Sequence, residues 1–303
     1  MAAPTENGIY CDITEADYAS WPHLRRSHLV KGFESMKKLR AAWDGLSDPQ
    51  TEAQRFGVAF HARILQPRLF AEQYIAVPDF QQDAPGQYKN YRATKEYRGK
   101  LAAFGAAHEG KEFLPHEDAA AIERMAEAVH ANPIAKLLKS GGGVECAITW
   151  EAEGVPLKIR TDLLVGAVGE NQRDRPVIID LKKEGRSAAP WSFRSALWRY
   201  RYDVQAAMAI DAVKDTTGKD ADFMFVVVED SAPHEVVVYQ PGAATIDGAR
   251  REYHSILQRI NWCKSHGIWP GLGYDYELED YQVQPIDVPQ WKLDEYEQEE
   301  AAI

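Results

Sequence analysis

Hydrophobic and polar positions alternate with a period of two along several segments of the second half of the chain. Such alternation is typical of β-strands with one buried face. The segment at 177–181 starts with an unbroken Val-Ile-Ile run, which is typical of a strand buried on both faces. A run of glycines at 141–143 comes just before the first of these segments. Strands are therefore predicted at 144–150, 156–165, 177–181, 222–228 and 235–240.

Helical periodicity occupies the rest of the chain. In the segment 52–65, Phe56, Phe60 and Ile64 recur at the spacing of one helical face. The pattern predicts an α/β fold: a central mixed β-sheet flanked by helices. We expect a single domain over 1–292, with a helical N-terminal part to about 140, a core at about 141–265 and an irregular acidic tail at 293–303. Further helices are predicted at 117–139, 193–213 and 246–263.

Two carboxylates and a lysine fall on neighbouring strands. Asp180 and Lys182 are two residues apart, so they project from one side of their strand, while Ile179 and Leu181 point into the core. Asp162 lies on the polar face of the preceding strand, so the two strands present both carboxylates to one point.

That polar face also carries Lys158 and Arg160, and the opposite face is expected to carry Leu157, Ile159 and Leu163.

Magnesium prefers oxygen ligands and commonly takes one or two carboxylates, which suits Asp162 and Asp180. A lysine beside such a site, here Lys182, stabilises the charge that develops on an attacked phosphate. The alternative is a solvated strand end, because Asp-x-Lys is a common triplet. The buried run before Asp180 favours the metal site, and manganese would suit the same oxygen ligands.

The order of these residues resembles the PD-(D/E)XK nuclease superfamily, and specifically its RecE-type exonuclease (exonuclease VIII) branch. The resemblance rests on Glu145, Asp162, Asp180-Leu-Lys182 and Tyr202-x-x-Gln205. It extends from about residue 8 to 291. Similar segments include Gly8-Ile-Tyr10 with Asp12 and Asp17-Tyr18, the helix 57–67, Glu145-Cys-Ala-Ile-Thr-Trp150 and the stretch 198–205.

The resemblance implies a magnesium-dependent exonuclease of the kind found in phage or prophage recombination and repair. Such an enzyme degrades one strand of linear duplex DNA from its 5′ end and leaves a 3′ tail for a single-strand annealing protein. The similar lambda-type exonucleases form rings around DNA, so a homo-oligomeric ring is expected. By the same resemblance Asp162 and Asp180 bind metal, Lys182 activates the water and Glu145 assists at the metal.

Three further residues have both a functional and a structural interpretation. His61 adjoins the apolar stripe of its helix and would be a packed core histidine, but the resemblance places a histidine near the second metal position. Tyr202 and Gln205 lie on the second face of the helix 193–213, where Gln205 would meet the substrate backbone. Without the resemblance, a plain amphipathic helix is equally favoured.

The formal net charge of −11 restricts DNA contacts to local basic segments. One is 87–100, where tyrosines interleave with cations that would share one helical face; the alternative is a solvated surface helix. In the segment that begins at Arg25, Arg26 and Ser27 fall where similar exonucleases grip the terminal 5′ phosphate. The predicted DNA-binding cations of the first segment are Lys89, Arg92, Lys95 and Arg98.

Composition sets the outer limits. The 303 residues are 45% hydrophobic and 27% charged, as in an ordinary globular protein. Without a membrane-length apolar run or a signal peptide, we expect a cytosolic protein that does not contact the membrane. Cys11, Cys146 and Cys263 are too few for a disulfide framework, a zinc ribbon or the four-cysteine iron–sulfur cluster of some related nucleases.

Two other functions stay open. An endonuclease or a single-strand-specific nuclease would use the same core, since one fold serves many substrates. A non-catalytic scaffold that binds DNA ends is a third interpretation, although Asp162, Asp180 and Lys182 are all present.

Overall fold

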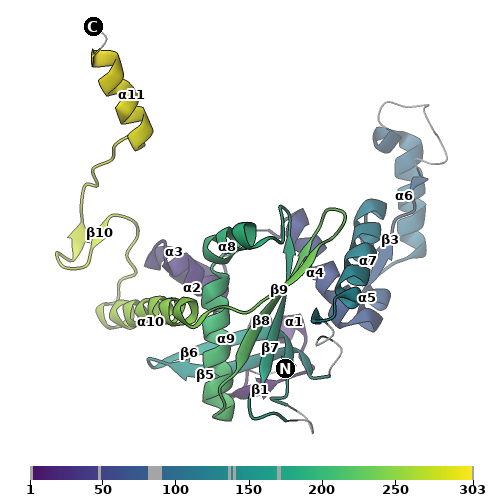
Figure 1. Ribbon diagram of the computed structural model, residues 1–303, viewed down its shortest axis with the longest axis horizontal. Helices are drawn as coiled ribbons and strands as arrows, with labels where there is room; N and C mark the ends of the chain where they lie inside the picture. Colours follow the sequence, from purple (N-terminus) through teal and green to yellow (C-terminus); the bar gives the residue numbers. More distant parts are fainter. Residues whose placement is uncertain are drawn as a thin grey trace.

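The computed structural model describes residues 3–46, 49–80, 91–135, 138, 141–168 and 172–301 (Figure 1). A seven-stranded mixed sheet forms its centre, in the order β1-β5-β6-β7-β8-β9, with β2 beside β6. The predicted α/β fold with a central mixed sheet is thus confirmed. Its strands are β1 (Gly8–Tyr10), β2 (Leu24–Arg25), β5 (Gly143–Ala152), β6 (Val155–Val165), β7 (Val177–Glu184), β8 (Asp222–Glu229) and β9 (Val236–Tyr239).

Helices cover the sheet in two groups, each over its own buried core. One core joins the sheet to α2, α3, α9 and α10, and the other joins it to α4 and α7. In Figure 1, α2, α3, α9 and α10 lie to the left of α4 and α7. The main helices are α1 (Glu15–Ser20), α2 (Arg26–Gly32), α3 (Met36–Trp43), α4 (Glu52–Leu65), α5 (Pro67–Gln73), α7 (His116–Ala131), α8 (Pro190–Arg199), α9 (Tyr202–Thr217) and α10 (Ala243–His266).

The single helix predicted at 193–213 is in fact two helices. Arg201 has a left-handed backbone with φ of 56°, and it separates α8 from α9. A non-glycine residue seldom adopts this conformation, so hydrophobic periodicity gives no signal for it. Because of this break, α8 and α9 run in different directions, and Tyr202 is the first residue of α9.

The antiparallel pairing of β5 with β6 is interrupted where Glu145 lies opposite Asp162. Glu145 has a left-handed backbone, with φ of 51°. The strands pair regularly on both sides of this point, so the interruption is local. It turns the Glu145 side chain out of the regular strand alternation, next to Asp162.

Strand β6 changes its buried face at the interruption. Leu157 and Ile159 pack in the core that contains α9, whereas Leu163 packs in the core beneath α4 and α7. The prediction that these three residues share one face is therefore wrong. The predicted polar face also contains Lys158, which is only 1% exposed.

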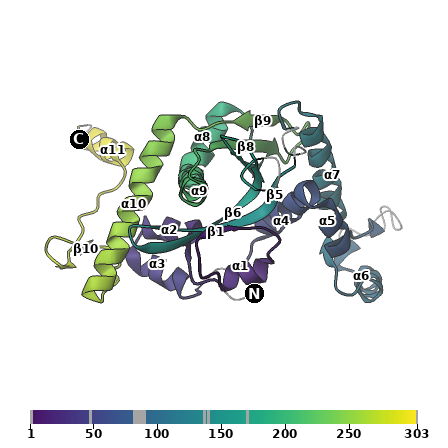
Figure 2. The ribbon, with the colours of Figure 1, turned by 90° about the horizontal axis from the view of Figure 1, so that it is seen from below.

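Lys158 holds the N-terminal segment against the sheet. Its Nζ donates hydrogen bonds to the carbonyls of Tyr18, at 2.6 Å, and Trp21, at 2.7 Å, and lies 4.6 Å from the Tyr18 ring centroid. Burial lowers the pKa of Lys158 to about 8. Figure 2 shows α1 on one side of β5 and β6 and α9 on the other.

We expect Lys158→Met to lower the free energy of unfolding by about 2–6 kcal/mol. The methionine keeps most of the volume, but it leaves two buried carbonyls without their donor, at about 1–3 kcal/mol each. Urea unfolding followed by circular dichroism measures the change, with the exposed Lys37→Met as control. Equal unfolding midpoints for both variants would contradict this role of Lys158.

A disulfide links Cys11, just after β1, to Cys146 in β5. The sequence analysis expected no disulfide framework and missed this single bond, because 135 residues separate the two cysteines. Antiparallel pairing of Tyr10 with Ala147 brings them together. A Cβ on Gly143 would overlap the Cys146 sulfur, so the close packing there requires glycine.

The basic segment predicted at 87–100 does not form one helical face. Lys89 lies outside the described residues, and Tyr91 is buried in a 3-10 turn, η2 (Tyr91–Ala93), so its ring is not open for stacking. Thr94 caps the following helix, which begins only at Lys95. This α6 (Lys95–Ala107) lies at the outer edge of the molecule, beyond the small sheet of β3 (Tyr74–Ala76) and β4 (Glu112–Leu114) (Figure 1).

The C-terminal segment is helical where the sequence indicates irregular chain. A two-stranded sheet of β10 (Tyr274–Asp275) and β11 (Asp280–Tyr281) leads to α11 (Gln290–Ala301), which stands away from the body in Figure 1. Within the described residues, none of the helices combines the length and the apolar character needed to cross a membrane.

Candidate active site

The candidate site lies where β6 and β7 separate. The last paired residues are Leu163 and Ile179, and the next residue on each strand is an aspartate, Asp162 and Asp180. Asp162 Oδ2 accepts a hydrogen bond of 2.6 Å from the backbone nitrogen of Leu181. The Leu181 nitrogen lies beyond the last β6–β7 pair, so the Asp162 carboxylate replaces a backbone acceptor. This hydrogen bond fixes the carboxylate at the opening.

On one side of the opening, His61 and Glu145 join Asp162. His61 projects from α4, and its Nδ1 lies 3.4 Å from Asp162 Oδ2. One donor atom from each of the three side chains lies within 4.8 Å of the others. His61 is therefore at the site, and only 26% of its side chain is exposed.

Arg160 is a member of this group that the sequence analysis did not select. Its Nε lies 2.8 Å from Glu145 Oε2, and the guanidinium also pairs with Glu15 of α1. Arg160 is two residues from Asp162 on β6, so its position on the same strand was visible in the sequence. Its partner was not, because the contact depends on the left-handed backbone of Glu145.

The charges of the group perturb one another. Burial, reinforced by the negative charge of Asp162, raises the pKa of Glu145 to about 7, although Arg160 opposes the shift. Burial also disfavours ionisation of Asp162, but the charge of His61 and its hydrogen bond outweigh this and lower the pKa of the carboxyl. Burial acts to lower the pKa of His61, but the charge of Asp162 and its hydrogen bond outweigh burial, so the pKa of His61 is raised.

On the other side of the opening, Asp180 and Lys182 form an ion pair through Oδ2 and Nζ. Asp180 is only 2% exposed, and burial raises its pKa against the effect of Lys182. Gln205 of α9 donates to Asp180 Oδ1 through Nε2 and accepts from Lys182 Nζ at 3.2 Å. The Lys182 Nζ also lies 4.5 Å from the centroid of the Tyr202 ring. Asp180, Gln205 and Tyr202 therefore hold the ammonium group in place.

Of the two residues predicted to grip a 5′ phosphate, only Arg26 reaches this group. Its Nη1 donates to Gln205 Oε1 at 3.2 Å and to the carbonyl of Tyr200 at 3.3 Å, and its guanidinium lies 5.7 Å from the Tyr202 ring centroid. Ser27 is exposed at the start of α2. Arg92, Lys95 and Arg98 are exposed around η2 and α6, and none contacts the residues of the site.

The group of His61, Glu145 and Asp162 fits a divalent cation. Two carboxylates and an imidazole converge there, and a cation would offset both the burial and the repulsion by Asp162 that raise the pKa of Glu145. Carboxylates and imidazole are both ligands of divalent metal ions, and this mixed set does not select one of them. Asp180 is outside the group, because its oxygens contact Gln205 and Lys182.

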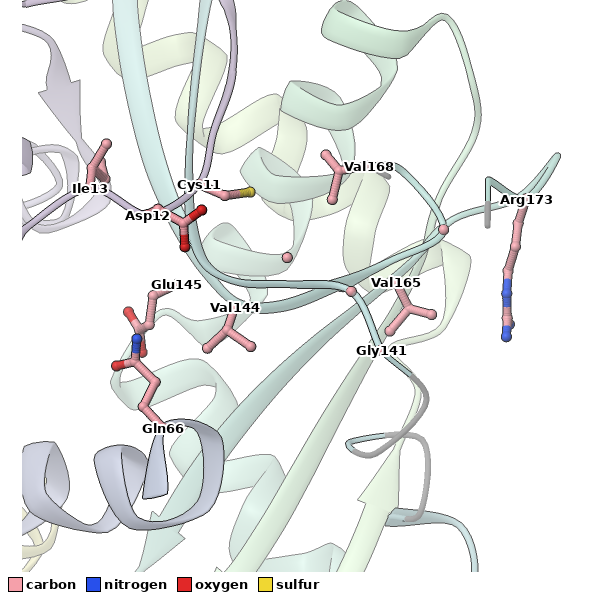
Figure 3. Close-up of a pocket in the computed structure, with 13 residues that line it drawn as sticks. Cys11, Asp12, Ile13, Gln66, Gly141, Val144, Glu145, Val165, Val168 and Arg173 are labelled. Carbon is pink, nitrogen blue, oxygen red and sulfur yellow. The ribbon is translucent and has the colours of Figure 1, made fainter. Parts of the chain in front are cut away.

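A cavity of about 510 Å³ adjoins the group at Glu145. It is lined by Cys11, Asp12, Arg173 and the glycines at 141–143. A Cβ on Gly142, whose φ is +157°, would come within 2.5 Å of the Leu164 carbonyl, so this wall requires glycine. In Figure 3, Glu145 and Gln66 point toward each other at one end of the cavity, so both side chains are within reach of a molecule bound there.

The sheet opens between β6 and β7, and each strand carries an aspartate at the opening. With a lysine two residues after the second aspartate, this arrangement is that of a PD-(D/E)XK fold. Residues 29–278 match the model of a protein family, the PDDEXK-like domain of unknown function DUF3799. The chain belongs to this family. No curated protein has a significantly similar sequence.

A solved structure shares the fold. The crystal structure of a putative exonuclease from Eubacterium rectale is similar, with a TM-score of 0.57 over 93% of this chain and 98% of that one, at 13% sequence identity. At this identity the likeness concerns the fold alone. The structure of SSO0001 aligns with 69% of this chain and 92% of that one, at 15% identity, but its TM-score of 0.28 carries no argument.

Proposed function

We propose that this protein is a divalent-metal-dependent 5′→3′ exonuclease that degrades one strand of linear double-stranded DNA and leaves 3′ single-stranded tails. The observation that carries the proposal is the pair of groups at the strand opening: donors of His61, Glu145 and Asp162 within 4.8 Å on one side, and the Asp180–Lys182 ion pair on the other. The similarity to a putative exonuclease supports it.

Each residue has a role in the proposed hydrolysis. His61, Glu145 and Asp162 would hold the metal, magnesium or manganese, and Asp180, on the other side of the opening, would be a further carboxylate ligand. The metal, when bound, would act as a Lewis acid that stabilises the negative charge on the attacked phosphate and on the leaving 3′ oxygen. Lys182 directs its Nζ, held by Gln205 and the Tyr202 ring, toward the attacking water and the developing negative charge.

The DNA end meets α2 and α9 in this proposal. Arg26 lies against Gln205 and Tyr202, and it would bind a terminal 5′ phosphate with help from the Ser27 hydroxyl. Arg92, Lys95 and Arg98 would contact the duplex farther from the cut. The resemblance to RecE-type enzymes further suggests a homo-oligomeric ring and a single-strand annealing protein as partner in recombination.

Arg26→Ala is expected to abolish the preference for a 5′-phosphorylated end. The wild-type enzyme should digest a 5′-phosphorylated duplex faster than its 5′-hydroxyl counterpart, because a charge-assisted hydrogen bond from Arg26 is worth about 1.5–3 kcal/mol. The ratio of the two initial rates measures the effect, with the exposed Arg251→Ala as control. An unchanged ratio in Arg26→Ala would exclude Arg26 as the end sensor.

Polarity is tested with a linear duplex that carries nuclease-resistant phosphorothioate linkages at both 5′ ends or at both 3′ ends. The proposed direction requires that only the 5′ modification blocks digestion in magnesium. Blocking by the 3′ modification alone would reverse the polarity and contradict this part of the proposal.

A further inference from the structure

Helix α8 exposes two tryptophans to solvent. Trp191 is 70% exposed and Trp198 is 71% exposed, although large aromatic side chains are usually buried for most of their area. They are seven residues apart, so they lie on one face of the helix, and the exposed Arg194 lies between them. The opposite face, with Phe193 and Ala196, packs into the core and fixes α8 in this orientation.

Exposed arginines lie on α8 and just before it. Arg194 and Arg199 are exposed on α8, and Arg186 is exposed just before it. None of these three guanidinium groups pairs with a carboxylate in the part of the chain that the structure describes. The chain has 46 acidic and 35 basic residues, so arginines without a carboxylate partner beside two exposed tryptophans depart from its overall charge.

Aromatic rings connect this surface to the candidate active site. Tyr200 directly follows α8, is 50% exposed, and its ring lies 5.6 Å from that of Tyr202. The Tyr202 ring in turn lies 4.5 Å from Lys182 Nζ. Figures 1 and 2 show α8 beside the end of α9 that carries Tyr202. The Tyr200 and Tyr202 rings therefore link the C-terminal end of α8 to the residues around Lys182.

We propose that this face of α8 binds single-stranded DNA: bases stack on Trp191 and Trp198, and phosphates pair with Arg194 and Arg199. The DNA that binds there is the unpaired strand at the end of the duplex. The inference therefore rests on the proposed function and adds a substrate contact to it. Stacking suits any base, because every base has an aromatic face. The unpaired arginines favour a polyanion over an apolar protein partner.

The test is binding of a fluorescein-labelled oligothymidine of twelve nucleotides to the full chain, followed by fluorescence anisotropy in chelator so that no cleavage occurs. Each tryptophan-to-alanine change should raise Kd about tenfold, because base stacking on an aromatic side chain contributes about 1–3 kcal/mol. The double variant Trp191→Ala/Trp198→Ala should therefore bind about a hundredfold more weakly. Phenylalanine at both positions should restore most of the affinity.

The chain provides a matched control, Trp291→Ala, which removes a tryptophan that is 64% exposed on α11. This variant should bind as the wild type does. Arg194→Ala/Arg199→Ala should weaken binding and flatten its dependence on salt, whereas Arg68→Ala on α5 should change neither.

Equal affinity of the double tryptophan variant and the wild type would overturn the inference, as would a wild-type protein that does not bind the oligonucleotide. Digestion of linear duplex in magnesium is measured on the same preparations. If digestion proceeds while the tryptophan changes have no effect on binding, only the proposed binding of single-stranded DNA to α8 is refuted. Absence of digestion in the wild type refutes the proposed function itself.

Discussion

Lys182→Ala is expected to lower the rate of DNA hydrolysis by about a thousandfold or more. The ammonium group is held by Asp180, Gln205 and the Tyr202 ring beside the strand opening. A preorganised charge aimed at a developing anion typically contributes about a hundredfold to a thousandfold, and a role in proton transfer adds to this. Single-turnover digestion of a linear duplex in magnesium measures the loss.

The adjacent lysine is the matched control. Lys183 projects to the other side of β7, where it pairs with Asp230 at 2.7 Å and lies 5.3 Å from the Phe56 ring centroid. Lys183→Ala should therefore digest DNA at nearly the wild-type rate. Normal turnover by Lys182→Ala, or equal losses in the two variants, would show that the catalytic group has been misassigned.

The second large effect is expected for Asp162→Asn. The amide keeps an oxygen that accepts from the Leu181 nitrogen, so the strand opening is preserved, but the charge that faces Glu145 and His61 is lost. Affinity for divalent ions depends on the number of charged ligands. We expect manganese binding at least about a hundredfold weaker and no detectable digestion, since loss of even an outer hydrogen-bond partner costs about tenfold to a hundredfold.

Isothermal titration calorimetry with manganese measures the affinity, and circular dichroism checks that the variant is folded. Asp222→Asn, at the start of β8, removes a carboxylate that pairs with Arg175 at the surface, so it should leave both metal binding and digestion intact. Wild-type affinity in Asp162→Asn would mean that the metal is held elsewhere.

The predicted sheet follows from local patterns, and most of its strands are confirmed. The alternation at 144–150 and 156–165 corresponds to β5 and β6, and the apolar run at 177–181 corresponds to the buried part of β7. Period-two alternation reports which side chains are buried, so it succeeds where strands are regular. It fails at the interruption between β5 and β6, where Glu145 leaves the regular conformation and β6 exchanges its buried faces.

The site was predictable in part for the same reason. The spacing of Asp180 and Lys182 on one strand fixes their shared direction, and the structure brings them into contact. The pairing of Arg160 with Glu145 was not predictable, because it needs a positive φ at Glu145. The prediction that cations and tyrosines share one helical face at 87–100 failed because Thr94 starts a new helix, a capping signal that hydrophobic periodicity does not contain.

The most direct test of the central claim compares linear duplex DNA with closed circular DNA, in magnesium and in chelator. A metal-dependent exonuclease built on His61, Glu145, Asp162 and Lys182 should consume only the linear DNA, only in magnesium, and release nucleotides from its ends. Cleavage of the circle would identify an endonuclease. Loss of neither substrate, or loss of the linear DNA in chelator, would contradict the account.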